Sequence, residues 1–222
     1  MRETLGLYTA VRTLLESAGA TFGIARYAKG TQIFRQGDNA DTVLHVESGR
    51  ALLAVTAATG KEAITGIAEP GTFLGEEALV GRTVRLHTAT TMTATTVLVV
   101  AKAEMAALLS TQPALSSRFI AFLITRQFRL ETNLIDQLLS CGEERLAHTL
   151  LHLAGCNARH LSSVLPSVSQ EIIAEMVGTT RSRVNFFMGR FKKAGFIYDN
   201  GGALHVDSRC LSRIHSRHPA VS

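Results

Sequence analysis

The stretch from Ser169 to Ile197 constrains the fold of this chain most strongly, because it has the pattern of two short helices joined by a tight turn. Ser169 is a favourable N-cap, and Glu171 in the first turn faces the positive end of the helix dipole. Gly178 can adopt the left-handed conformation that ends a helix, and either Thr179 or Thr180 can cap the next one. We therefore expect a helix-turn-helix here.

The second of these helices is expected to have two different faces. Apolar residues at i, i+3, i+4 and i+7 form its core-facing stripe, and these are Val184, Phe187, Met188 and Phe191. The opposite face carries Arg181, Ser182, Asn185, Phe186 and Arg190. A cationic, hydrogen-bonding face suits the major groove of DNA, although a helix pair with merely solvated charges has the same pattern.

A hairpin signal after the second helix favours DNA binding. Residues 196–198 and 203–206 are strand-like and flank the turn sequence Asp199-Asn200-Gly201-Gly202. Helix, turn, helix and hairpin together make a winged helix-turn-helix. Positions 166–222 also hold eight basic and four acidic side chains, which is most of the net charge of +5 and fits a phosphate-backbone partner.

The predicted DNA contacts are Gln170, Thr180, Arg181, Ser182, Arg183, Asn185 and Phe186. Arginine near the start of a recognition helix suits O6 and N7 of guanine, and asparagine suits adenine. Thr180 and Arg183, at the helix start and flank, are expected on phosphates. Phe186 is expected against thymine methyl groups, with a core position as the alternative because Phe187 beside it faces the core.

Composition and cysteine usage indicate an ordered protein of a reducing compartment. The hydrophobic fraction is 46% and the charged fraction 18%, and the three cysteines are widely spaced. There is no secretory h-region and no apolar run near the eighteen residues of a membrane span, so we expect a cytoplasmic protein without a membrane partner. No nucleophile, Walker or H-E-x-x-H motif is present, and we expect no enzyme activity.

The N-terminal half changes from helical to β character. Leu7, Val11, Leu14 and Leu15 predict a short amphipathic helix within residues 1–20. From Ile24 to about Val100, short β-branched runs separated by glycines predict an antiparallel barrel or jelly roll. His45 and His87 lie in strand-like segments, where a hydrogen-bonded structural histidine is expected rather than a ligand.

Residues 103–154 are predicted to be helical, with interruptions near Pro113 and around residues 140–142. A 3–4 spacing within this region predicts a short coiled-coil seam with one polar position, formed by Ile120, Leu123, Gln127, Leu130 and Leu134. The stripe would serve as a homodimer interface, with packing against the protein's own barrel as the alternative. Residues 155–165 are expected to form a loop.

Barrel, long helix and winged helix-turn-helix, in this order, resemble the cyclic-AMP receptor protein/FNR (CRP/FNR) family of bacterial transcription regulators. In the first half the resemblance rests on Gly30-x-x-Ile33-Phe34-x-Gln36-Gly37-Asp38, Gly49, Pro70-Gly71-x-Phe73-x-Gly75-Glu76-x-Ala78-Leu79 and Arg85. In the second half it rests on Ala174, Gly178, Thr180, Val184, Gly189-Arg190-Phe191 and Gly195-Phe196-Ile197.

The resemblance implies an α+β fold with three parts. These are a cyclic-nucleotide-binding-type β-barrel (jelly roll) over residues 1–110, a dimerisation helix over 111–140 and a winged helix-turn-helix over 141–222. It also implies a homodimer on a palindromic DNA operator, with RNA polymerase as a further partner.

By the same resemblance, Gly75, Glu76 and Arg85 would lie in an effector pocket, with Glu76 towards a ribose hydroxyl and Arg85 towards a cyclic phosphate. An ion pair between Glu76 and Arg85 that closes the barrel is the alternative. Leu86 stands where cyclic-AMP-binding members carry Ser or Thr, and Leu130 and Glu131 stand where small hydroxyl residues would contact the base. A cyclic nucleotide is therefore only weakly supported, and the effector stays unidentified.

Other ligands of the family find no matching residues. An iron–sulfur cluster would need cysteines before Cys141, and a haem would need a Cys/His pair beside His87. His148, His152 and Cys156 are spaced i, i+4, i+8, which fits a metal site, although a core-facing stripe is more common and we expect no metal.

One further expectation follows from the resemblance. Ser182 and Phe186 replace the Glu and Arg of the two well-known branches, so the operator should differ from theirs. The alternative function is a small-molecule sensor that acts through protein contacts with little DNA binding.

Overall fold

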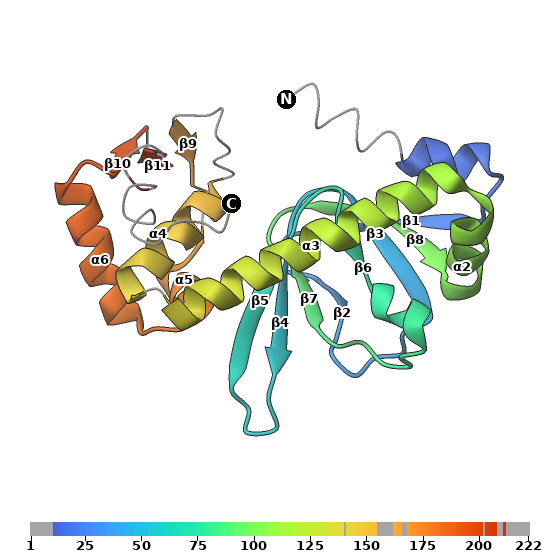
Figure 1. Ribbon diagram of the computed structural model, residues 1–222, viewed down its shortest axis with the longest axis horizontal. Coiled ribbons are helices and arrows are strands. Elements are labelled where there is room, and N and C mark those ends of the chain that lie inside the picture. Colours follow the sequence, from blue (N-terminus) through green and yellow to red (C-terminus); the bar gives the residue numbers. More distant parts are fainter. Residues whose placement is uncertain are drawn as a thin grey trace. The chain divides into compact units, whose positions relative to one another are not determined.

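The computed structural model describes residues 11–139, 141–154, 162–165, 168–201, 203–207 and 211, except the side chains of 136–139 and 162–163. Its contacts divide the chain into two units, Met1–Phe128 and Arg129–Ser222, with the division inside the helix α3 (Pro113–Leu139) (Figure 1). The division into domains at 110 and 140 stays a prediction.

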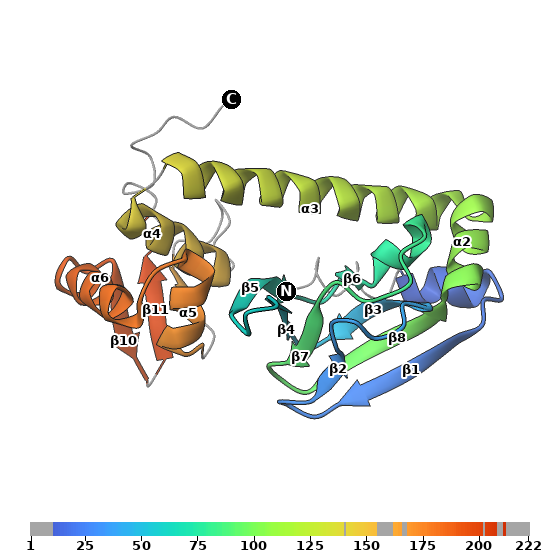
Figure 2. The ribbon, with the colours of Figure 1, turned by 90° about the horizontal axis from the view of Figure 1, so that it is seen from below.

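Two four-stranded antiparallel sheets make up most of the first unit, in the orders β1-β8-β3-β6 and β2-β7-β4-β5. The strands are β1 (Phe22–Tyr27), β2 (Gln32–Phe34), β3 (Thr42–Ser48), β4 (Ala51–Thr56), β5 (Glu62–Ala68), β6 (Phe73–Leu74), β7 (Thr88–Thr91) and β8 (Thr95–Ala101). The sheets face each other without closing into one continuous barrel (Figure 2). The predicted jelly-roll type of fold is confirmed.

Side-chain alternation along β3 separates two apolar clusters. Leu44 and Val46 contribute to a cluster that also draws on β4, β5, β6, β7 and β8. Val43 contributes to the other cluster, together with residues of the helical segment 11–17, α2 (Lys102–Thr111) and the start of α3. These helices therefore cover the outer face of the first sheet, and Phe73 packs edge-on against Phe119 at 5.1 Å between ring centroids.

The long helix α3 begins at Pro113, a position where the missing proline N–H costs no hydrogen bond. Leu115 and Phe119 are buried in the first unit, and Phe122 is partly buried against the same cluster. Further apolar side chains on the helix are exposed, namely Ile120, Leu123, Ile124, Phe128, Leu130, Leu134 and Ile135. No single helix of the described residues is long and apolar enough to cross a membrane, although α2 and Pro113–Ile135 pass that test together across a bend of 109°.

The second unit contains three helices and a small sheet. The helices are α4 (Gly142–Leu153), α5 (Gln170–Val177) and α6 (Arg181–Lys193), and the sheet has the order β10-β11-β9. Its strands are β9 (Ser162–Val164), β10 (Ile197–Asn200) and β11 (Ala203–Asp207). The predicted winged helix-turn-helix is confirmed.

The predicted loop 155–165 is wrong over residues 162–164, because these pair with β11 as a third strand. Residues 155–161 lie outside the described residues.

Local capping explains the boundaries of α5 and α6. The Ser169 hydroxyl accepts a hydrogen bond from the Ile172 N–H, and Gly178 ends α5 at a φ of 68°. Thr180, rather than Thr179, caps α6 by accepting from the Arg183 N–H at 3.3 Å. The turn between the helices therefore has the predicted chemistry.

Candidate nucleic-acid interface and effector pocket

The helix α6 presents one face to the core of the second unit and the other to solvent. Val184, Phe187, Met188 and Phe191 are buried, as the sequence pattern predicts. Arg181, Ser182, Arg183, Asn185 and Phe186 are exposed. Phe186 is 63% exposed although its ring lies 5.5 Å from that of Phe187 in an edge-on arrangement. Its core alternative is therefore wrong, and the exposed face combines cationic, amide, hydroxyl and aromatic groups.

Two contacts from α4 position the helix-turn-helix. Arg190 Nη1 lies 2.9 Å from Glu143 Oε2, and Arg145 Nε donates to the Val177 carbonyl at 3.1 Å. Arg190 belongs to the polar face of α6, but its guanidinium joins α6 to α4. It therefore acts as a scaffold contact, which the helical periodicity alone does not reveal.

The first turns of α5 and α6 are joined by an ion pair. Arg181 Nη1 lies 2.8 Å from Glu171 Oε1. Gln170, the first residue of α5, is half-buried, and Thr180 is exposed at its capping position. All seven predicted DNA contacts thus lie on α5, α6 or the turn between them.

The hairpin of β10 and β11 forms a wing beside α6. Tyr198 stacks on His205 with ring centroids 5.4 Å apart, and Lys192 Nζ of α6 lies 2.6 Å from Asp199 Oδ2. This ion pair joins the end of α6 to the first strand of the wing.

A separate polar site in the first unit surrounds Arg85, which is only 4% exposed. Its Nη2 donates to Thr42 Oγ1 at 2.7 Å, and its guanidinium carbon lies 4.7 Å from the centroid of the Phe34 ring. Gly75 has a φ of 76°, and a Cβ there would lie 1.7 Å from Arg85 Nη1. Only glycine at this position allows the guanidinium to pack against the backbone.

The buried guanidinium is incompletely satisfied by its surroundings. Nε and Nη1 of Arg85 have no hydrogen-bond partner among the described residues. Burial lowers the pKa of Arg85, although Glu77, Asp41 and Asp38 oppose this effect. A buried cation with two unpaired donors is suited to an anion, because the guanidinium fork can donate to two oxygens of a phosphate or carboxylate.

Glu76 is paired with Arg126 of α3 and not with Arg85. The predicted alternative, a Glu76–Arg85 ion pair, is therefore wrong, because Arg85 turns to Thr42 and Phe34 instead. Burial raises the pKa of Glu76 and Arg126 opposes the rise. Burial, reinforced by the charge of Arg126, lowers the pKa of His87.

Arg126, which pairs with Glu76, was not among the residues that the sequence predicted for the effector pocket. It lies one helical turn before Leu130, on the helix already expected to contact an effector, and this spacing was the available signal. Leu86 is 42% exposed and Leu130 is 54% exposed, and Glu131 is exposed. Leu130 and Glu131 belong to the second unit, so their contribution to the pocket stays a prediction.

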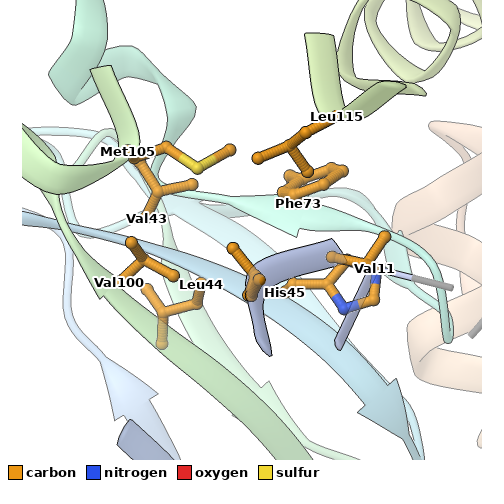
Figure 3. A pocket seen from close by; sticks show the side chains of 9 residues that line it. Val11, Val43, Leu44, His45, Phe73, Val100, Met105 and Leu115 are labelled. Atoms are coloured by element: carbon orange, nitrogen blue, oxygen red, sulfur yellow. The ribbon is translucent and has the colours of Figure 1, made fainter. Parts of the chain in front are cut away.

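The apolar cavity in Figure 3 lies on the other side of β3. Its volume is about 10 Å³, which is room for about one water molecule and none for a nucleotide. His45 is its polar lining residue, is 2% exposed, and has no hydrogen-bond partner on either ring nitrogen among the described residues. Burial lowers its pKa from 6.5 to about 4. The structural role predicted for His45 therefore holds, but its predicted hydrogen bond is wrong.

The predicted dimer seam is exposed along α3. Ile120, Leu130 and Leu134 are 54–55% exposed and Leu123 is 37% exposed. Gln127 is also exposed. Within the first unit, Ile120 and Leu123 are therefore not covered by its sheets, and the dimer seam stays a prediction.

The histidines of the metal alternative lie on α4, where His148 is half-buried and His152 is exposed. Cys156 lies outside the described residues. Within the described part of the chain, no group of three or more His, Cys, Asp or Glu side chains could hold a metal ion.

Comparison with known proteins agrees with this arrangement. The model of the cyclic nucleotide-binding domain matches residues 24–112, and that of the Crp-like helix-turn-helix domain matches residues 144–213. The CRP-like cAMP-activated global transcriptional regulator of Mycobacterium tuberculosis is 27% identical over 191 residues, covering 84% of this chain and 85% of the relative. The cyclic AMP receptor protein of Thermus thermophilus is 28% identical over 187 residues, covering 83% and 84%.

Among solved structures, FixK2 of Bradyrhizobium japonicum is similar with a TM-score of 0.76. It is 18% identical, and the match covers 89% of this chain and 99% of that chain. At this identity the similarity concerns the fold alone.

Proposed function

The chain belongs to the CRP/FNR family of transcription regulators, and from this premise we propose that it acts as a homodimer that binds a palindromic DNA operator and responds to an effector in its N-terminal unit. The family assignment includes a helix-turn-helix DNA-binding domain. The dimer, the operator contacts and the effector are the content of the proposal.

The exposed face of α6 is the observation that carries the proposal. Arg181, Asn185 and Phe186 project from a helix whose opposite face is buried. A helix held by its back leaves its front available to base edges in the major groove, and the wing lies beside it for backbone contacts. The residues proposed to contact DNA are those predicted: Gln170, Thr180, Arg181, Ser182, Arg183, Asn185 and Phe186.

The exposed stripe on α3 supports the homodimer. Ile120, Leu123, Leu130 and Leu134, with Gln127 as the polar position, form a seam of the kind that two antiparallel or parallel helices bury against each other. A two-fold dimer would present two copies of α6 to two half-sites, so the proposed operator is palindromic.

The proposed effector is an anion that contacts Arg85. The buried, unpaired Nε and Nη1 support this assignment, and the absence of a Cβ at Gly75 allows the guanidinium to occupy this position. Cyclic AMP activates the M. tuberculosis relative. Here Leu86 lacks the hydroxyl that would bond a cyclic phosphate, and we propose that another anionic ligand is the physiological effector.

The protein-contact alternative is not favoured, because the exposed face of α6 would then have no use. As part of the proposal, the protein acts in the cytoplasm, where duplex DNA and RNA polymerase, its further expected partner, are both present.

Binding to duplex DNA at several salt concentrations tests the proposal. We expect the logarithm of the association constant to fall linearly with the logarithm of the salt concentration, since several phosphates are neutralised. A scrambled duplex of equal length is the control and should bind at least about a thousandfold more weakly than a selected operator. Equal, weak binding to both duplexes would favour the protein-contact sensor.

A further inference from the structure

The ion pair between Glu171 and Arg181 joins two exposed side chains at the entrance of the helix-turn-helix. Their side chains are 52% and 68% exposed, and Arg181 Nη1 lies 2.8 Å from Glu171 Oε1. An ion pair this exposed contributes little to the free energy of folding, because water competes for both charges. Its main consequence is therefore the direction in which the Arg181 guanidinium points.

Glu171 is itself held at the N-terminus of α5. Hydrogen bonds from its own backbone N–H and from the Ser169 hydroxyl, together with the charge of Arg181, keep its pKa below the usual value. The Ser169 oxygen meanwhile accepts from the Ile172 N–H. The carboxylate is thus charged and lies in the first turn of α5, 2.8 Å from Arg181 Nη1, where it can orient the guanidinium.

An anchored guanidinium can still read a base. Its planar fork carries five N–H donors, so the contact through Nη1 leaves Nε and Nη2 as two parallel donors on another edge. Guanine offers O6 and N7 as two acceptors in the major groove. The carboxylate also repels phosphates, which opposes the use of Arg181 as a backbone contact.

From this geometry we infer that Glu171 is a positioning residue that sets the guanine specificity of Arg181. The inference rests on the proposed function, because α6 must enter the major groove for Arg181 to reach a base. Without the carboxylate, Arg181 swings between base and phosphate, and discrimination at one position of each half-site is lost.

The test compares Glu171→Gln with Glu175→Gln, which removes the same charge from an exposed position on the same helix. The full chain is titrated with the wild-type operator and with a duplex in which adenine replaces guanine at the position read by Arg181. We expect the guanine preference to fall at least about fivefold in Glu171→Gln and to remain in Glu175→Gln. Binding to a scrambled duplex stays equal or tightens, since one repulsive charge is gone.

A double-mutant cycle separates positioning from a structural effect. In an Arg181→Ala background, Glu171→Gln should no longer change the base preference. An unchanged guanine preference in the single variant, or a change that persists without Arg181, overturns the inference. Equal thermal unfolding of the two glutamine variants controls for folding. A wild-type protein without any sequence preference would overturn the proposed function as well, so the two failures are distinguishable.

Discussion

At the scale of single residues, Arg85 shows how a buried charge depends on partners that are distant in the sequence. The glycine and the arginine of this site follow from a recognisable motif, Gly75 with Arg85 ten residues later. No such motif indicates the other contacts of this site, which are the stacking on Phe34, the hydrogen bond to Thr42 and the Glu76–Arg126 pair. These contacts join strands and a helix that only the fold brings together. Sequence patterns find side chains, whereas pairing depends on tertiary geometry.

Cyclic AMP should bind weakly or not at all to this pocket. Leu86 offers no hydroxyl to a cyclic phosphate, and a lost hydrogen bond to a charged group costs about 1.5–3 kcal/mol. Calorimetry of the full chain measures this directly. Affinity at micromolar concentration or tighter, abolished by Arg85→Ala but kept by Arg82→Ala at an exposed neighbouring position, would prove the expectation wrong.

His45 should make the folded state sensitive to acid. Its pKa is about 4 in the folded protein, whereas the ordinary value of 6.5 applies to the unfolded chain. As the pH falls, the unfolded chain therefore binds a proton before the folded protein does. The stability that a neutral His45 allows is therefore present above pH 6.5 and is lost as the pH falls towards 4. Between pH 7 and pH 5 the loss should be about 2 kcal/mol.

Urea unfolding of the wild type and of His45→Leu at both pH values measures this loss. The carboxylates titrate in both proteins, so the difference between them isolates His45. Parallel pH dependence of the two proteins would show that His45 does not carry the effect.

At the scale of elements, the C-terminal helices were predictable because their signals are local. Capping residues, a left-handed glycine and the 3–4 apolar spacing determine α5 and α6, and each of these signals lies within a few residues of the helix it determines. The short strand β9 has no such signal, since Ser162-Ser163-Val164 becomes a strand only by pairing with β11. The outward position of Phe186 was predicted, because Phe187 and not Phe186 falls on the core-facing stripe of the helix.

Thr180 and Arg183 should contact phosphates, in contrast to Arg181. Alanine at either position should weaken binding to operator and scrambled duplex by a similar factor, and Arg183→Ala should lower the salt slope by about one. Thr180→Ala also removes the cap of α6, which costs about 1 kcal/mol of stability, so its thermal unfolding is measured alongside. A selective loss on the operator alone would reassign these residues to base reading.

At the scale of the whole molecule, the exposed stripe of α3 is the proposed homodimer interface. Light scattering should give twice the chain mass of 23.9 kDa. Leu123→Glu with Leu130→Glu should yield monomers with much weaker operator binding, since a charge in an apolar seam cannot be buried without a partner. Val80→Glu, at an 83% exposed position outside the predicted seam, is the matched control and should leave the dimer intact. A wild type that is monomeric at micromolar concentration would count against the seam.

Selection of binding sites from a random DNA pool, with the wild type and with Arg181→Ala, tests the central claim most directly. The wild type should return a palindrome whose half-sites lie one helical turn apart, about 34 Å. Arg181→Ala should return the same palindrome with one relaxed guanine position in each half-site and an affinity lower by about 1–3 kcal/mol. Two identical motifs would show that Arg181 does not read a base and that α6 does not enter the groove as proposed.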